Sequence, residues 1–472
     1  MVNAPAAHPE TRARALLEWA QRVGPADPMT THEHLLTEAL LIENDQPALA
    51  AEMLGEAAWI AVTIDADRAL DAARRAHSLG PGAPNVALAL AMTLVVAGRA
   101  EEGDAVATAA LASLDRDAGS MFTLSRSAVL SLWREHYDDA RRLLERAITC
   151  ARDEHNQVVL ANALDTHAAL DYRTGKWPAA RARSAEALRI AEAVGGELQR
   201  ASCLTTLARL DAVSGREADC RRRVAEALDL ADGNRTHVAY AVSARGLLAL
   251  GLDDPEEAIR ELGPLRAAFD DRAEPMVVQW VPDLLEALAR AGRNDDWSDV
   301  FAWFEDSTRG AGATTWTRAV AARCRGLGAG GRDFDGAFHE ALELHSKTPT
   351  PFERARTELC YGERLRRARR RADANGYLLA ALATFERLGA APWATRARRE
   401  LGRGTRLGGA IETQLTAHEI EVVSLVVRGL TNREAAAALF VSPKTIDYHL
   451  VNVYRKLDVR SRTELTRLML GR

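Results

Sequence analysis

A segment near the end of the chain places mostly polar side chains on one face of a predicted helix. The residues recur every three or four positions, which is the period of an α-helix, and they are Lys444, Asp447, Tyr448, Val451 and Arg455. Mixed polar groups can meet base edges in the major groove of DNA, while flanking lysine and arginine side chains hold phosphates. The spacing therefore predicts a surface that contacts both bases and phosphates.

The other side of the same predicted helix is apolar. A stripe with helical spacing would be buried there, formed by Ile446, Leu450, Val453 and Leu457. Ser442 precedes the helix as an N-cap, and Pro443 occupies the first helical position. A helix over about 443–457 that is buried on one side and polar on the other is typical of a recognition helix.

Three neighbouring helices are predicted from their ends. Residues 416–419, 431–434 and 461–464 each place a hydroxyl residue three positions before a glutamate, which is the pattern of a capping box. Gly429 predicts a Schellman-type end for the first helix, about 417–428, and a tight turn at 440–442 separates the second helix from the third. The order of caps, turn and stop favours a helix-turn-helix over a small helical bundle without a ligand.

These motifs resemble the LuxR-type DNA-binding domain from residue 415 to about residue 470. The residues that carry the resemblance are Leu415, Thr416, Glu419, Glu421, Val422, Gly429, Leu430, Thr431, Asn432, Arg433, Glu434, Ala436, Ser442, Pro443, Lys444, Thr445, Ile446, His449, Asn452, Val453, Lys456, Leu457, Val459, Ser461, Arg462, Glu464 and Leu465. The resemblance implies a four-helix domain that binds double-stranded DNA.

The resemblance also assigns roles to single residues. It implies phosphate contacts at Lys444, Thr445, His449 and Lys456. The polar face of the helix adds Arg455 as a further phosphate contact. It implies base contacts at Asp447, Tyr448, Val451 and Asn452. The fourth helix, about 462–470, would form a dimer contact through the apolar residues Leu465, Leu468 and Met469, although packing within the domain also explains that edge.

Three positions depart from the residues that are common in this family. His418 replaces a frequent arginine, Asp447 a frequent lysine, and Val451 a residue that is often polar or basic. A carboxylate can accept a hydrogen bond from cytosine N4 but does not attract phosphates. Residues 411–472 contain nine Lys or Arg and seven Asp or Glu, a net charge of only +2. We therefore expect modest non-specific affinity and a need for dimerisation.

The region from residue 11 to residue 400 is predicted to be a helical array. It is rich in Ala, Leu, Arg and Glu, and short turns recur within it. Glycines 98, 175, 215, 292 and 331 mark a period of about 40 residues, longer than the roughly 34 residues of a tetratricopeptide unit. The pattern favours a tetratricopeptide-like superhelix of nine or ten helix pairs over an irregular helical domain. Residues 1–10 are expected to be a disordered leader, residues 401–412 a Gly-rich linker, and residues 413–472 the DNA-binding domain.

The order of a long-period array and a LuxR-type domain resembles the C-terminal half of the large ATP-binding LuxR regulators, the maltose-regulator class. Those proteins begin with a P-loop ATPase, but the motif Gly-x-x-x-x-Gly-Lys-[Ser/Thr] does not occur in this chain. The resemblance is compatible with a short relative and with one half of a longer chain. The sequence does not favour ATP hydrolysis.

Composition limits the classes of function. The 472 residues carry a net charge of −5, so DNA binding is expected to be local. Five scattered cysteines without a C-x-x-C pattern predict reduced thiols in a cytoplasmic protein, with no metal site and no cofactor. No apolar run approaches the roughly 18 residues of a membrane helix, and no catalytic constellation is recognisable, so an enzyme is not expected.

The sequence therefore predicts a sequence-specific transcriptional regulator. The array would sense a small-molecule inducer or a protein, and two chains would bind double-stranded DNA as a homodimer, with RNA polymerase as a further candidate partner. The alternative is an interaction scaffold whose C-terminal bundle docks a protein.

Overall fold

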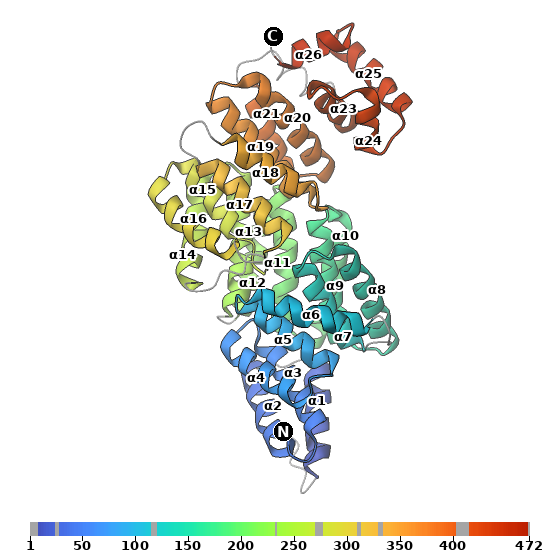
Figure 1. The fold of residues 1–472 in the computed structure, drawn as a ribbon, viewed down its shortest axis with the longest axis vertical. Coiled ribbons are helices and arrows are strands. Elements are labelled where there is room, and N and C mark those ends of the chain that lie inside the picture. The colour runs from blue at the N-terminus through green and yellow to red at the C-terminus, as the bar shows by residue number, and fades with distance from the viewer. Residues whose placement is uncertain are drawn as a thin grey trace.

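The computed structural model describes residues 8–23, 28–114, 120–231, 234–269, 277–308, 313–328, 334–402 and 415–470. Within these ranges every regular element is an α-helix. Figure 1 shows the helices stacked along the long axis of an elongated molecule, from the N-terminal helices at one end to the C-terminal domain at the other. The prediction of an all-α fold is confirmed.

The helices of the array have the following bounds: α1 (Pro9–Val23), α2 (Pro28–Ile42), α3 (Pro47–Ala61), α4 (Ala66–Leu79), α5 (Pro84–Val96), α6 (Ala100–Leu114), α7 (Met121–Trp133), α8 (Tyr137–Asp153), α9 (Gln157–Arg173), α10 (Trp177–Val194), α11 (Glu197–Ser214), α12 (Glu217–Ala231), α13 (Arg235–Gly251), α14 (Pro255–Ala268), α15 (Val281–Ala291), α16 (Asn294–Thr308), α17 (Thr315–Gly328), α18 (Asp335–His345), α19 (Pro351–Arg367), α20 (Arg371–Leu388) and α21 (Ala391–Gly402). The C-terminal domain contains α23 (Ala417–Val427), α24 (Asn432–Leu439), α25 (Pro443–Leu457) and α26 (Arg462–Leu470).

A left-handed backbone residue marks the turn inside successive helix pairs. Four of these turns contain glycine, at residues 98, 175, 215 and 292, with φ between 74° and 77°. Glu135, Asp253 and Arg369 take the same conformation, with φ between 61° and 71°, at the turns where the sequence has no glycine. These positions follow one another at the spacing that the glycines predict, and Gly331 lies outside the described residues.

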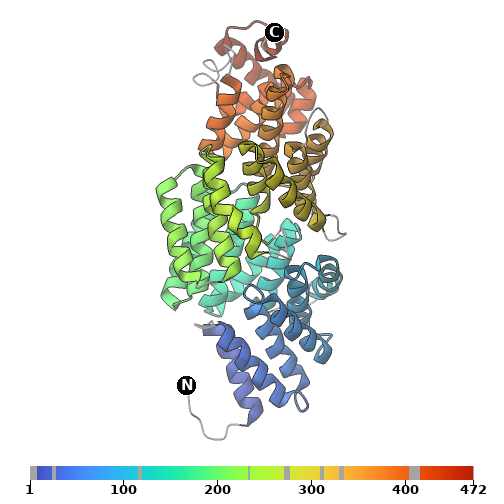
Figure 2. The same ribbon diagram turned by 90° about the vertical axis from the view of Figure 1, so that its left-hand side faces the viewer.

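The pairs stack so that one helix of each faces the interior of the superhelix. Helices α7, α9, α11 and α13 pack side by side as this inner layer, and α8, α10, α12 and α14 cover them. Figure 2 shows this stack from a second direction. The layer is held by apolar and alanine-rich surfaces, because small side chains let helices approach closely. The predicted tetratricopeptide-like superhelix is confirmed.

The C-terminal domain is docked on the last helices of the array. Helices α23 and α26 pack against α20. One hydrophobic core contains Leu378 and Leu382 of α20, Ile420 and Val423 of α23, and Leu465 of α26. Residues 403–412 of the predicted linker lie outside the described ranges. No described helix is both long enough and apolar enough to cross a lipid bilayer.

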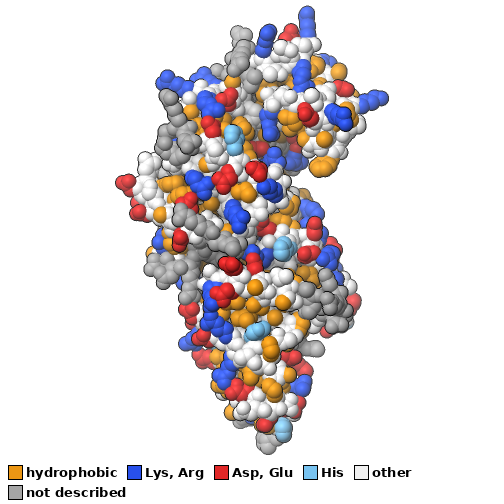
Figure 3. All heavy atoms as spheres, in the orientation of Figure 1, with side chains coloured by type: hydrophobic (Ala, Val, Ile, Leu, Met, Phe, Trp, Pro, Cys, Tyr) orange, Lys and Arg blue, Asp and Glu red, His pale blue; other side chains and the backbone are white. Residues whose placement is uncertain are grey.

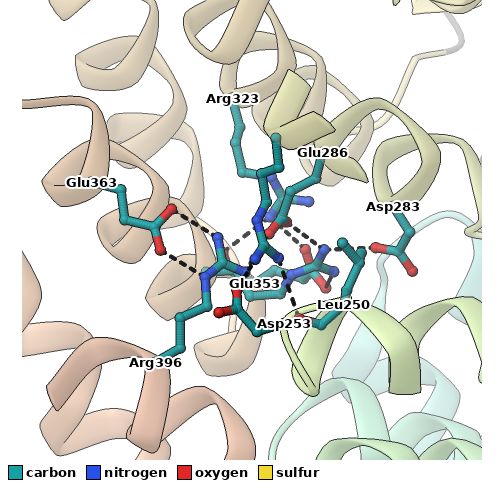
Figure 4. A network of polar contacts seen from close by, with 10 residues as sticks. Leu250, Asp253, Asp283, Glu286, Arg323, Glu353, Glu363 and Arg396 are labelled. Atoms are coloured by element: carbon teal, nitrogen blue, oxygen red, sulfur yellow. Dashed lines mark hydrogen bonds and ion pairs between the residues drawn. The ribbon is translucent and has the colours of Figure 1, made fainter. Parts of the chain in front are cut away.

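A buried ionic network joins α15, α17, α19 and α21, as Figure 4 shows. Glu286 accepts hydrogen bonds from Arg356 at 2.8 Å and from Arg396 at 2.7 Å. Arg396 also donates to both oxygens of Glu363, and Arg323 donates to a carboxylate of α19 at 2.7 Å. No sequence pattern indicates this cluster, because its members come from distant segments and share no motif.

Candidate nucleic-acid interface

The predicted recognition helix is α25, and its observed bounds are those expected from the sequence. Ile446, Leu450 and Val453 are buried against α23 and α24, whereas Leu457 is only partly buried. The apolar stripe thus orients the helix, because only one rotation about its axis removes these side chains from water.

The opposite face of α25 is open to solvent. Tyr448 is 66 % exposed and Val451 is 65 % exposed, which is unusual for side chains of this size and apolarity. Lys444, Asp447 and Arg455 are also exposed on this face. Figure 3 shows lysine and arginine side chains projecting from the end of the molecule where the C-terminal domain lies. All five residues predicted from the helical period therefore share an accessible surface.

The N-terminus of α25 is capped as predicted. The Oγ atom of Ser442 accepts a hydrogen bond from the backbone N–H of Thr445 at 3.1 Å, and the two hydroxyl groups lie 2.8 Å apart. Ser442 and Pro443 are exposed, so the positive end of the helix dipole faces solvent. A phosphate can be bound at such a helix end by the backbone N–H groups.

Two of the three predicted capping boxes are present, and the third differs. Thr416 with Glu419 and Thr431 with Glu434 make both reciprocal contacts. At α26 the backbone N–H of Glu464 donates to Ser461 at 3.1 Å, but the Glu464 carboxylate accepts from the N–H of Arg460, one residue before the cap. The prediction of a reciprocal box was wrong there, because the carboxylate reaches an earlier N–H.

The residues assigned to phosphates lie in different surroundings. The Nζ atom of Lys456 forms an ion pair of 2.6 Å with Glu419 and is only partly exposed. Partial burial raises the pKa of Glu419, but its contacts with Lys456 and Thr416 outweigh burial and lower the pKa. Lys444, in contrast, is exposed and has no described side-chain partner. Lys456 therefore stabilises the domain, whereas Lys444 is available to a phosphate.

Two further predicted residues lie at the edge of the exposed face. His449 is partly buried, and its ring lies 5.6 Å from that of Tyr448 and 6.3 Å from that of His418. The Oδ1 atom of Asn452 accepts a hydrogen bond from Arg455 at 3.3 Å. His449 thus lies beside the rings of Tyr448 and His418, and Asn452 is hydrogen-bonded to Arg455 on the same helix.

Asp447 is positioned by two residues that no sequence pattern indicated. Asn432, at the start of α24, donates to the Asp447 carboxylate, and Arg462 of α26 donates to Asn432 at 2.9 Å. Arg462 also donates to the carbonyl oxygen of Leu430. This relay ties the exposed carboxylate to two other helices. The resemblance includes Asn432 and Arg462, but it does not indicate that they meet across the domain.

The predicted dimer edge is covered in this structure. Leu465 and Met469 are fully buried, and Leu468 is partly buried, because α26 packs against both α23 and α20. The side-chain amide of Asn375 on α20 donates to the backbone oxygen of Met469. Arg387 of α20 forms an ion pair with Glu421 of α23. Intramolecular packing therefore occupies the surface to which the resemblance assigns a dimer contact.

Comparison with known proteins identifies this domain. Residues 413–469 match the model of the luxR family of bacterial regulatory proteins. A protein of Mycobacterium tuberculosis with the name of an HTH-type transcriptional regulator is 45 % identical over 86 residues, which are 18 % of this chain and 9 % of that protein. The transcriptional regulatory protein LiaR of Bacillus subtilis is 42 % identical over 50 residues, 11 % of this chain and 24 % of LiaR. The chain therefore spans about a tenth of the length of the first relative and about a quarter of the second.

The array has a solved neighbour of similar fold. A Rap protein complexed with competence and sporulation factor aligns with a TM-score of 0.56 and 13 % identity, over 72 % of this chain and 99 % of that chain. At this identity the likeness concerns the fold alone. The C-terminal residues thus form a LuxR-type helix-turn-helix domain, and a helical-repeat array precedes it.

Proposed function

We propose that this protein is a sequence-specific transcriptional regulator of the cytoplasm that binds double-stranded DNA through α25. The exposed face of α25 is the observation that carries the proposal. Tyr448 and Val451 are large side chains that remain in water, although an isolated domain gains nothing from exposing them. Contact with base edges in the major groove would bury them.

The array controls this activity through its contact with α26. Two-fold symmetric operators require a protein dimer, and the family resemblance assigns dimerisation to α26. Because α23 and α20 together cover Leu465 and Met469, a chain in the observed conformation cannot use both residues for a second copy. A ligand that weakens the contact between α20 and α26 would release the domain and allow a homodimer to form on DNA.

The first experiment is a selection from a random DNA library with the full chain. We expect one enriched two-fold motif, because two recognition helices related by symmetry read two half-sites. In Tyr448→Ala the motif should be altered, or its affinity reduced about tenfold, since a lost base contact costs roughly 1–3 kcal/mol. Fluorescence anisotropy on the selected site measures the affinity.

Leu41→Ala is the matched control for this selection. Leu41 is an exposed apolar residue on α2, far along the chain from the C-terminal domain, so its removal should leave the motif unchanged. Enrichment of no motif, by the full chain and by a variant with a weakened α20 contact, would contradict the proposal. It would favour a C-terminal bundle that docks a protein.

A further inference from the structure

A cavity of about 520 Å³ opens inside the N-terminal half of the array. Its walls come from α1 and α3 and from the inner helices α7, α9, α11 and α13. This volume is in the range of sites that hold small ligands. The cavity lies far along the chain from α25, so DNA binding does not account for it.

One part of the cavity wall is aromatic. Trp59, Phe122, Trp133, Tyr172 and Tyr240 line it, together with aliphatic side chains of α3, α7 and α9. The hydroxyl group of Tyr240 donates a hydrogen bond to the backbone oxygen of Val277, so the Tyr240 ring is held in place. Such a surface binds apolar side chains. The polar groups of a ligand would need hydrogen-bond partners from other residues of the cavity.

A row of polar side chains supplies that second set. Ser125 of α7 donates to Asn162 of α9 at 2.9 Å, and the amide of Asn162 donates to Gln199 of α11 at 3.4 Å. Each of these three residues lies on a different inner helix, because Asn162 and Gln199 are 37 residues apart, which is about one repeat. An amide side chain offers a donor and an acceptor together, as a peptide group does.

Part of the hydrogen-bonding capacity of this row is unused. The only described acceptor for the side-chain amide of Gln199 is the Sγ atom of Cys203, at 3.5 Å, which is a weak contact. Thr205 of α11 also lines the cavity, but its Oγ1 atom is buried and has no hydrogen-bond partner among the described residues. The Gln199 amide can therefore donate a stronger hydrogen bond to a ligand in the cavity.

Charged groups of both signs reach the cavity. Arg126 is paired with Glu56 at 2.5 Å, and Arg209 lies over the ring of Tyr172. Asp165 has no described cationic partner, and its carboxyl oxygens accept from Ser202 at 2.7 Å and from a second serine. The lining therefore suits a ligand that carries a positive and a negative group more than one with a large net charge.

We propose that this cavity binds a short peptide in an extended conformation. Neighbouring packed helices are about 8–10 Å apart, and three extended residues span about 10 Å, so amide groups on successive inner helices can meet a peptide backbone every third residue. The aromatic wall receives its apolar side chains, and Asp165 and Arg209 face its charged termini. This inference names the ligand class of the sensor and in that respect rests on the proposed function.

The test uses the full chain and a random mixture of cysteine-free pentapeptides with free termini. Protein-bound peptides are recovered by gel filtration and sequenced by mass spectrometry, and the most enriched one is synthesised for calorimetry. We expect enrichment of apolar sequences. Asn162→Ala and Gln199→Ala should each reduce the affinity for the synthetic peptide roughly threefold to tenfold, which corresponds to the loss of one hydrogen bond. Ala169→Phe, which places a large ring in the cavity, should abolish binding.

Asn85→Ala is the matched control, because Asn85 on α5 also accepts a hydrogen bond from the next inner helix but does not line the cavity. Circular dichroism confirms that each variant is folded. Retention of no peptide, or equal retention by wild type and Ala169→Phe, would overturn the inference. The DNA selection on the same protein separates the two proposals, since a chain that enriches a DNA motif and retains no peptide contradicts only the peptide site.

Discussion

At the scale of single residues, two neighbours fix the orientation of Asp447, which we propose as a base-reading residue of α25. Its carboxylate accepts from Asn432, which is itself held by Arg462 at 2.9 Å. A carboxylate held in this way repels phosphates and accepts a hydrogen bond from cytosine N4. We therefore treat Asn432 as a positioning residue for base readout.

Removal of the relay should change specificity more than affinity. In Asn432→Ala we expect the base preference at one position of each half-site to relax, by roughly 1–3 kcal/mol of discrimination, because Asp447 loses its fixed orientation. The dependence of affinity on salt should stay the same, since no phosphate contact is lost. Binding to a set of single-base operator variants measures the first quantity, and a salt titration the second.

Lys444→Ala is the contrasting variant for this residue-scale prediction. Lys444 is exposed and lacks a described partner, so its loss should lower the affinity for all operators by the same factor. The slope of log affinity against log salt concentration should decrease in magnitude by about 1. If Asn432→Ala instead lowered the affinity for every operator by the same factor and also lowered the thermal stability, the relay would have only a structural role.

At the scale of elements, the contact of α20 with α23 and α26 links the array to the DNA-binding domain. It combines apolar packing with the Arg387–Glu421 ion pair and the hydrogen bond from Asn375 to Met469. Gly376 lies at the same contact, where an added Cβ would come within 3.2 Å of the Arg428 side chain. The domain is thus held by specific groups on one face of α20.

Weakening this contact should increase the affinity of the full chain for its operator. In Asn375→Ala combined with Arg387→Ala we expect about a fivefold or larger gain, since coupling between sites is typically about 1–3 kcal/mol. The physical reason is that α26 no longer has to be released from α20 before a dimer forms. Operator titrations and sedimentation of the complex give the affinity and the stoichiometry.

Arg371→Ala tests whether any loss of an arginine from α20 has this effect. Arg371 is an exposed residue at the start of the helix, and we expect wild-type affinity. An unchanged or lower affinity of the double variant would show that α20 does not restrain the domain.

At the scale of the whole molecule, the ionic network of Figure 4 joins four helices in the last third of the superhelix. Burial raises the pKa of Glu286, but Arg356 and Arg396 outweigh burial and place that pKa far below its usual range. The side chains of Arg356 and Arg396 are themselves almost fully buried. Removal of one charge therefore leaves others uncompensated in a medium of low polarity.

We expect Glu286→Gln to lower the free energy of unfolding by about 3–5 kcal/mol at neutral pH. Because the folded pKa is depressed, the wild-type carboxylate stabilises the fold above the unfolded pKa of roughly 4.3, and this contribution falls as the pH decreases toward the folded pKa. The difference between wild type and variant should therefore be constant above about pH 5 and shrink below it. Urea unfolding at several pH values checks both statements.

The exposed pair of Glu340 with Arg325 provides the control for this prediction. Glu340 is about half exposed, so Glu340→Gln should change stability by at most about 1 kcal/mol. A similar small effect of Glu286→Gln would show that the network is not essential to the fold.

The sequence by itself determined the local features of this protein. Caps, turns and apolar stripes act over a few residues, so the bounds of α25, the caps of α23 and α24, and the repeat register were predictable from residue types. The helical period also predicted which residues share the exposed face of α25, because that period alone decides which side chains lie on one face of a helix. Glu135, Asp253 and Arg369 continue this register at turns without glycine, although a positive φ is uncommon for Glu and Arg.

The tertiary structure alone decided which distant groups meet. The pairing of Lys456 with Glu419, the relay from Arg462 to Asp447 and the burial of Met469 under α20 depend on how helices pack, and no local pattern encodes them. The cavity and the ionic network also depend on the superhelical path of the array, which brings segments more than one repeat apart into contact. Local propensity sets each helix, whereas packing over long sequence separations sets the contacts between helices.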